Sequence, residues 1–136
     1  LFPYGITMQD NGAVTVFPAA EVLFQTVGGE WAPTFLVIDS GATISVLPKS
    51  DASILGIIGE KGNHMTVKGV GGDLIYGWRH EAKIKLGDSM LTIPLVFLDD
   101  LQAPRVLGRD GIFDKFLIKP SSPPFHISYL FLLYFV

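Results

Sequence analysis

The amino-acid sequence predicts an all-β protein. Its 15 glycines and nine prolines recur between short runs of β-branched and aromatic residues, which is typical of strands joined by tight turns. No stretch has the long periodicity of an amphipathic helix. The length of 136 residues and the apolar share of 49% are right for one core, so we expect residues 1–136 to form a single domain.

The first expected strands follow short turns. Asp10 to Gly12 predict a turn before a strand over residues 13–17, and Gly28–Gly29 predict another before the strand Thr34–Ile38. Because residues 34–38 are apolar on both faces, we expect this strand to be buried in the middle of the core.

Two hairpins are expected in the middle of the chain. Residues 65–78 form two strand-like arms around a glycine-rich tip, which predicts a mobile hairpin. Apolar residues then alternate over 82–86 and again over 91–95, on either side of the turn Gly87–Asp88. This alternation predicts a second hairpin with one buried face.

Two short helices are also expected. Pro48–Leu55 predicts one, capped by Ser50 or Asp51, with its last two residues facing inward and its end at the following glycine. Further on, residues 104–108 predict a short buried strand, and Arg109–Phe116 predicts the second helix, with its phenylalanines on the inner side.

Composition excludes several functions. The net charge is only −3 and the ten basic residues are scattered, so the sequence has no electrostatic footprint for nucleic acid. The absence of cysteine excludes disulfides, thiolate nucleophiles and Cys-based zinc sites. His64, His80 and His126 lack metal-ligand spacing, so we expect no metal and no cofactor. Carboxylates, hydroxyls and histidines must carry any chemistry.

The ends of the chain give weaker signals. The sequence starts at Leu1, so we expect a piece processed or excised from a longer protein. The apolar tail 125–136 is shorter than the ~20 residues of a membrane-spanning helix, which favours a buried or interfacial strand and leaves a truncated anchor as the alternative. Membrane association is expected only through this tail or through sequence outside the chain, and the default location is cytoplasmic.

Asp39 is the acidic residue that the pattern singles out. It ends the apolar strand 34–38, where a carboxylate needs hydrogen-bond partners to offset the cost of leaving water. Gly41 allows a sharp turn that brings backbone N–H groups close to the carboxylate, and Ser40 offers a hydroxyl. Asp-Ser-Gly alone is weak support for catalysis, because it also occurs as an ordinary turn.

Two ordered motifs strengthen the case. Phe35–Pro48 reads as an apolar strand, Asp-Ser-Gly-Ala and a further apolar strand, and Val106–Phe116 reads as two apolar residues, Gly-Arg-Asp and a short helix. In both respects the sequence resembles the retropepsin-like aspartic protease family, over about residues 13–118. The resemblance makes Val67–Trp78 the flap, a hairpin that closes over substrate.

The resemblance implies a closed β-barrel of the retropepsin type with a flap hairpin and one short C-terminal helix. It makes Asp39 the catalytic residue. It assigns support of the active-site loop to Ser40, Gly41, Ala42 and Thr43, the flap to Lys68, Gly69, Val70, Gly71, Gly72 and Asp73, and structural roles to Gly108, Arg109 and Asp110.

One Asp-Ser-Gly per chain implies a homodimer, in which two Asp39 carboxylates lie so close that they share one proton. Aspartic proteases are the standard example of such a pair. The expected activity is cleavage of extended polypeptides with apolar side chains around the cut bond, at mildly acidic pH and with sensitivity to pepstatin. A catalytically silent dimerisation or peptide-binding module of the same fold is the alternative.

The chain departs from the family pattern at its end. Retroviral members build their dimer sheet from terminal strands, whereas the three prolines in residues 119–124 interrupt the strand pair expected there. How the C-terminal tail takes part in assembly stays open.

Overall fold

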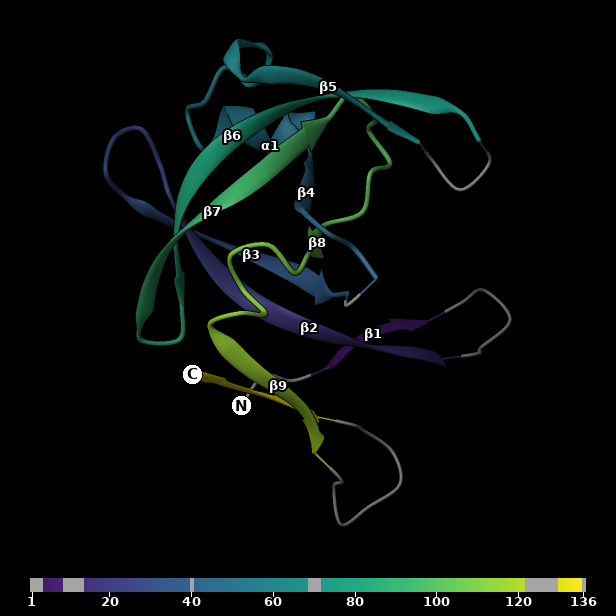
Figure 1. Ribbon diagram of the computed structural model, residues 1–136, viewed down its shortest axis with the longest axis vertical. Helices are drawn as coiled ribbons and strands as arrows, with labels where there is room; N and C mark the ends of the chain where they lie inside the picture. Colours follow the sequence, from purple (N-terminus) through teal and green to yellow (C-terminus); the bar gives the residue numbers. More distant parts are fainter. Residues whose placement is uncertain (1–3, 9–13, 40, 69–71, 122–129, 136) are drawn as a thin grey trace.

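The computed structural model describes residues 4–8, 14–39, 41–68, 72–121 and 130–135, and it consists mostly of β-strands with one short α-helix (Figure 1). The all-β prediction is confirmed in this sense. The elements in chain order are β1 (Tyr4–Met8), β2 (Val14–Gln25), β3 (Trp31–Ile38), β4 (Ser45–Pro48), α1 (Lys49–Ile54), the 3₁₀ helix η1 (Gly59–Lys61), β5 (Asn63–Lys68), β6 (Leu74–Leu86), β7 (Ser89–Leu98), β8 (Val106–Leu107), β9 (Phe116–Ser121) and β10 (Leu130–Phe135).

Eight strands form one sheet in the order β1-β2-β3-β8-β4-β7-β6-β5. β3 pairs in parallel with β8, and β4 pairs in parallel with β7. β2 makes a second pairing, with β6, in which Phe24 lies opposite Ile84. The two-residue strand β8 therefore lies between β3 and β4, the strands on either side of Asp39 in the sequence.

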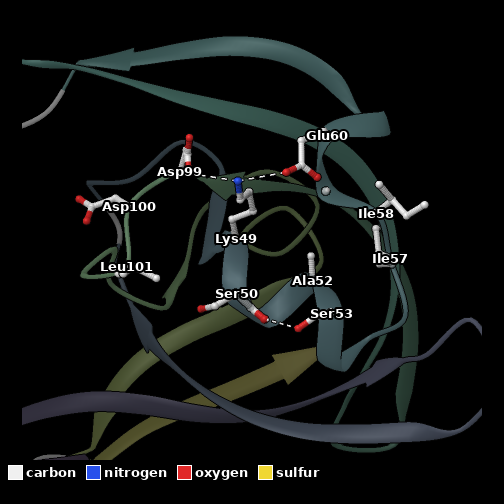
Figure 2. A pocket seen from close by; sticks show the side chains of 11 residues that line it. Lys49, Ser50, Ala52, Ser53, Ile57, Ile58, Glu60, Asp99, Asp100 and Leu101 are labelled. Atoms are coloured by element: carbon white, nitrogen blue, oxygen red, sulfur yellow. Dashed lines mark hydrogen bonds and ion pairs between the residues drawn. The ribbon is translucent and has the colours of Figure 1, made fainter.

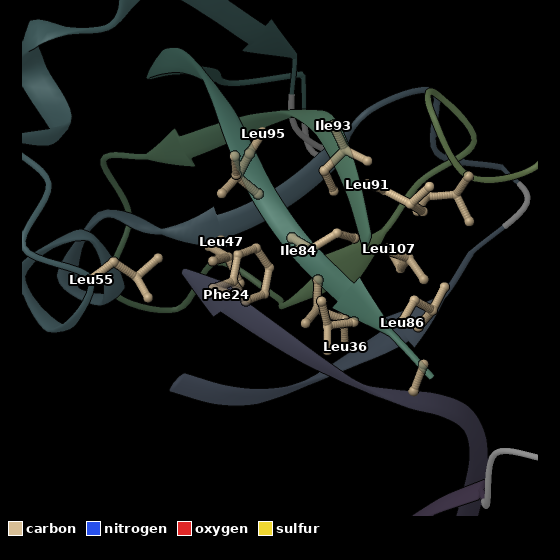
Figure 3. Close-up of a cluster of buried hydrophobic side chains, with 14 of the residues drawn as sticks. Phe24, Leu36, Leu47, Leu55, Ile84, Leu86, Leu91, Ile93, Leu95 and Leu107 are labelled. Carbon is tan, nitrogen blue, oxygen red and sulfur yellow. The ribbon is translucent and has the colours of Figure 1, made fainter. Parts of the chain in front are cut away.

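The β6–β7 hairpin supplies much of the core. Its tight turn has Gly87 at φ 60°, and Leu86 lies opposite Ser89, as the sequence predicts. Every residue of the predicted alternation is buried: Ala82, Ile84, Leu86, Leu91, Ile93 and Leu95. Figure 3 shows most of them packed against side chains of β2, β3, β4 and β8, including Phe24, Leu36, Leu47 and Leu107. Each buried Leu or Ile side chain stabilises the fold by about 1.5–3 kcal/mol.

β7 changes character along its length. Beyond Ile93 its residues 95–98 are buried on both faces, because the second face contacts another set of apolar side chains. This second apolar cluster consists of Val96, Leu98 and Ala103, with partly buried Ile44, Val46, Met65, Val67 and Ile75 packed against it. It joins the β5–β6 hairpin to the strand that follows Asp39.

Helix α1 is confirmed, with its polar contacts differing from the prediction. Neither Ser50 nor Asp51 caps the helix, since Pro48 occupies the N-cap position without a side-chain hydrogen bond. Asp51 is instead buried and receives two hydrogen bonds from Arg105, at 2.7 and 2.9 Å. Gly56 ends the helical segment at φ 73°, as predicted. Of the last two residues of the predicted helix, Leu55 is buried whereas Ile54 is 70% exposed.

The prediction of a helix over residues 109–116 is wrong. Residues 109–115 form consecutive turns, with the amides of Ile112 and Phe113 both bonded to the carbonyl of Arg109, and β9 begins at Phe116. Gly111 has φ 78°, a left-handed conformation that cannot propagate a right-handed helix. Ile112 is fully buried, and Phe113 packs partly buried against the main core.

β3 is less buried than expected. Leu36 and Ile38 are buried, whereas Phe35 on the opposite face is 59% exposed. The apolar character of this face therefore does not reflect burial within one chain.

The C-terminal strand pair exists despite the prolines. β9 runs through Pro120, which lies opposite Phe131 of β10. A strand with a single partner has one edge free, where a missing N–H removes no ladder bond. These two strands lie at the opposite end of the molecule from the β5–β6 hairpin (Figure 1). None of the helices in the described ranges is long and apolar enough to cross a membrane. The predicted turn at 10–12 lies outside the described residues.

Candidate active site

Asp39 follows β3 directly and begins a tight loop. Its amide donates to the carbonyl of Leu107 in β8 at 3.1 Å, so the loop starts on the support of a neighbouring strand. Its carbonyl accepts from the amide of Ala42 at 3.2 Å, which closes the turn. The carboxylate oxygen Oδ1 accepts from the amide of Gly41 at 2.8 Å, the backbone contact that the sequence predicts. This bond fixes the direction in which the carboxylate points.

Gly41 is suited to its place beside the carboxylate. A Cβ atom at this position would lie 3.1 Å from Oδ1 of Asp39, which is tighter than an ordinary contact. Glycine therefore lets the amide approach the carboxylate without crowding it. The side chain of Asp39 is exposed in the single chain, contrary to the burial expected from the apolar strand before it. Ser40 lies outside the described residues.

The two sequence motifs meet in space. The amide of Arg109 donates to the carbonyl of Ala42 at 3.0 Å, and the amide of Asp110 donates to the carbonyl of Thr43 at 2.8 Å. The guanidinium of Arg109 also donates to the hydroxyl of Thr43 at 3.1 Å. Residues 108–110, which directly follow β8, thus run alongside the Asp39 loop and are hydrogen-bonded to it. The side chains of Thr43, Arg109 and Asp110 are exposed.

Gly108 permits this close crossing. A Cβ atom on Gly108 would lie 2.5 Å from the carbonyl carbon and oxygen of Ile44, which is too close for any residue other than glycine unless the backbone moves. The amide of Gly108 donates to the hydroxyl of Ser45, which is completely buried, at 3.0 Å.

Sequence reasoning assigned no structural role to Ser45. The available signal was a single polar residue within the apolar run Ile44–Leu47, where a buried hydroxyl needs a partner. The partner itself lies too far along the chain for a local pattern to reveal it.

The predicted flap residues fall on the β5–β6 hairpin. Lys68 lies opposite Leu74 at the end of the paired arms, and Gly72 has φ 83°. Gly69, Val70 and Gly71 lie outside the described residues, whereas Lys68 and Asp73 are exposed. The hairpin is connected to the chain that follows the Asp39 loop through the second apolar cluster, because side chains of both segments pack against its buried residues. These side chains are Val67 and Ile75 of the hairpin and Ile44 and Val46 after the loop.

One hollow in the described part of the chain lies away from Asp39. It has a volume of about 390 Å³ and is lined by α1, η1 and residues 99–101 (Figure 2). Asp39 is not among its lining residues. Within the described ranges, no three His, Asp or Glu side chains are grouped so that they could hold a metal ion.

Comparisons with known proteins agree with this arrangement. A family model described as aspartyl protease matches residues 25–111. A retropepsin-like aspartic protease from Rickettsia conorii has a similar structure, with 16% identity, a TM-score of 0.62, and coverage of 93% of this chain and 95% of that chain. The EIAV protease complexed with the inhibitor HBY-793 is also similar, with 22% identity, a TM-score of 0.56, and coverage of 76% of this chain and 88% of that chain.

No curated protein sequence matches this chain at a significant level. The family match covers the first motif and the Gly-Arg-Asp part of the second, and the structural similarity extends over most of the chain. The chain belongs to the aspartyl protease family, and its fold is similar to that of retropepsin-like aspartic proteases.

Proposed function

We propose that this protein is an aspartic endopeptidase in which Asp39 acts together with Asp39 of a second copy. The observation that carries the proposal is the Asp39 loop. An exposed carboxylate, oriented by the amide of Gly41, stands on a loop that is hydrogen-bonded to the carbonyl of Leu107 and to the amide of Arg109. Such a loop holds a carboxylate in one position for chemistry.

A single carboxylate cannot supply both an acid and a base at one moment. Asp-Ser-Gly occurs once in the chain, so the second carboxylate must come from another copy. Two carboxylates within hydrogen-bond distance share one proton. The ionised member takes a proton from water, whose oxygen forms a bond to the peptide carbonyl carbon. The protonated member donates its proton to the carbonyl oxygen, which gives a tetrahedral diol. The carboxyl group that took the proton from water then donates it to the amide nitrogen, the C–N bond breaks and the amine leaves, while one hydroxyl of the diol returns its proton to the other carboxylate.

The closed barrel and the flap belong to the same proposal. The pairing of β2 with β6 supports the barrel, because it links strands that are far apart in the sheet order. The β5–β6 hairpin supports the flap, because its two arms are paired as far as Lys68 and Leu74. Apolar side chains of the second cluster between the hairpin and β4 favour a substrate with apolar residues around the cut bond.

The test is cleavage of a mixed peptide library from acidic to neutral pH. The wild-type protein is compared with Asp39→Ala and with Asp88→Ala, a control that removes an exposed carboxylate from the β6–β7 turn. We expect the cleavage rate of Asp39→Ala to fall at least about 100-fold, because general acid–base catalysis usually accelerates a reaction by at least this factor. Asp88→Ala should retain full activity. Pepstatin should inhibit the wild type.

Equal cleavage by wild type and Asp39→Ala would refute this role for Asp39. No cleavage by the wild type at any protein concentration would favour the alternative, a catalytically silent dimerisation or peptide-binding module of the same fold.

A further inference from the structure

Lys49, the first residue of α1, contacts three separate elements. Its Nζ lies 3.0 Å from Oε1 of Glu60 in η1 and 3.2 Å from Oδ1 of Asp99 after β7. It also lies 5.3 Å from the centre of the Trp78 ring in β6. Figure 2 shows the lysine between the two carboxylates. One side chain therefore joins the helix after β4 to both sides of the hairpin base.

The same base is held by other contacts. Nε2 of His80 in β6 is hydrogen-bonded to the carbonyl of Gly59 at 2.7 Å, and Gly62 crosses so closely that a Cβ there would meet the carbonyl of Arg79 at 2.6 Å. The amide of Asp99 donates to the carbonyl of Tyr76 at 2.8 Å. These contacts attach the start of β5 and the middle of β6 to their surroundings.

Beyond its base the hairpin is held by apolar packing. Its inner side chains, Met65, Val67 and Ile75, lie in the second apolar cluster with Ile44 and Val46. A substrate lying between the hairpin and the Asp39 loop would have to enter this region. The direction of the hairpin during binding then depends on how its base is fixed.

We infer that Lys49 is a positioning residue that sets the β5–β6 hairpin over the Asp39 loop. This inference rests on the proposed protease function, because it gives the hairpin the role of a flap. Among the described residues, the ion pairs and the ring contact of Lys49 are with Glu60, Asp99 and Trp78. Lys49 acts through these three residues, and so controls the population of hairpin orientations that can bind substrate.

The two ion pairs are exposed enough to be sensitive to salt. The side chain of Lys49 is 35% exposed, and those of Glu60 and Asp99 are 52% and 51% exposed. Exposed pairs are screened by salt over a Debye length of about 8–10 Å at physiological ionic strength and about 3 Å at 1 M. We therefore expect high salt to loosen the hairpin base in the wild type, and to have little effect once the lysine is gone.

The experiment compares Lys49→Met with Lys49→Arg, which retains the charge. Lys83→Met is the matched control, because Lys83 is an exposed lysine of β6 with no ion pair among the described residues. Hydrogen exchange of the β5 and β6 amides is measured first. The fluorescence of Trp78 is then followed during a NaCl titration in a Trp31→Phe background. Finally, kcat and KM are measured for an uncharged apolar peptide. The background leaves one tryptophan of the two in the chain.

For Lys49→Met we expect hairpin amides to exchange roughly two- to fivefold faster, which is the range that exposed ion pairs permit. KM should rise by a similar factor with kcat nearly unchanged, because a smaller fraction of the protein is competent to bind. Lys49→Arg should restore both values. Salt should shift the Trp78 emission of the Lys49 protein toward that of Lys49→Met and leave the variant unchanged.

Unchanged exchange at the hairpin in Lys49→Met would overturn the inference, as would an equal effect of Lys83→Met. A loss of kcat at constant KM would also overturn it. If Lys49→Met does not fold, Glu60→Gln breaks one pair while keeping the lysine, and the same criteria apply. If the wild type cleaves nothing, the protease function fails, and hydrogen exchange and fluorescence still decide whether Lys49 positions the hairpin.

Discussion

The buried hydroxyl of Ser45 accepts a hydrogen bond from the amide of Gly108 at 3.0 Å, although the two residues are 63 positions apart. This bond joins the strand after the Asp39 loop to the second sequence motif. It also satisfies a backbone donor that lies against the carbonyl of Ile44 and away from water. Several predictions concern this junction and its neighbours.

Ser45→Ala should destabilise the protein by about 1–2 kcal/mol, because the amide of Gly108 loses its partner inside the fold. Urea unfolding monitored by circular dichroism measures the change. Ser53→Ala is the control, since the Ser53 hydroxyl donates to the carbonyl of Ser50 at an exposed position. A Ser45→Ala protein as stable as Ser53→Ala would show that water replaces the missing hydroxyl.

Gly108→Ala should be more damaging. The new methyl group would overlap the backbone of Ile44, which can move only if the Asp39 loop moves with it. We expect a loss of about 1–3 kcal/mol or more in unfolding free energy, together with a fall in cleavage rate. Gly28→Ala provides the control, because Gly28 has ordinary φ and its nearest contact would be Thr26 Oγ1 at 3.8 Å. Equal stability of the two variants would contradict the crowding.

Arg105→Met should destabilise the protein through the carboxylate that it leaves behind. The side chain of Asp51 is only 9% exposed and Arg105 is its ion-pair partner. Removing one partner of a buried pair costs about 3–5 kcal/mol, and we expect about 2–3 here because the Arg105 side chain is half exposed. Arg79→Met breaks an exposed pair with Glu81 and should change stability by less than about 0.5 kcal/mol. Thermal and urea unfolding distinguish the two cases.

The contribution of Glu60 to stability should depend on pH. The pKa of Glu60 is lowered from its ordinary value of 4.5, first by a hydrogen bond from its own backbone amide and then by Lys49. The folded state therefore favours the ionised form, so the stabilisation is complete above the ordinary pKa and is lost as the pH falls through the lower folded-state pKa. The difference in Tm between wild type and Glu60→Gln should be present at pH 6 and vanish in strong acid.

The opposite trend, with a difference that grows below about pH 4, would contradict the lowered pKa of Glu60. The pKa of Lys49 is raised, chiefly by its hydrogen bond to Glu60, so the lysine stays charged across this range. Both members of the pair are thus ionised at the mildly acidic pH proposed for catalysis.

Mixing should reveal whether two copies form the site. When wild type is mixed with a large excess of Asp39→Ala, most wild-type chains pair with a variant that lacks the second carboxylate. We expect the activity per wild-type chain to fall steeply, whereas excess Asp88→Ala should not lower it. Dilution should also reduce specific activity below the dissociation constant of the dimer. Activity that is unaffected by excess Asp39→Ala would refute the shared site.

The sequence by itself determined the features that are written in local patterns. Alternating apolar residues on either side of Gly87–Asp88 predicted the β6–β7 hairpin and its buried face, because the two-residue period of a strand is visible in a short window. The two family motifs identified the Asp39 loop and the segment 108–110. Each of these signals depends on neighbours within a few residues.

Only the tertiary structure decided which distant residues meet. Asp51 was predicted as a candidate helix cap, whereas it pairs with Arg105, 54 positions away. No local pattern predicted the contacts of Lys49 with Glu60, Asp99 and Trp78. Phe35 was predicted to lie in the core and is exposed. The helix predicted after Arg109 does not form, because Gly111 is left-handed and Ile112 is buried. Side-chain polarity fixes what a residue needs, but the path of the whole chain decides which partner supplies it.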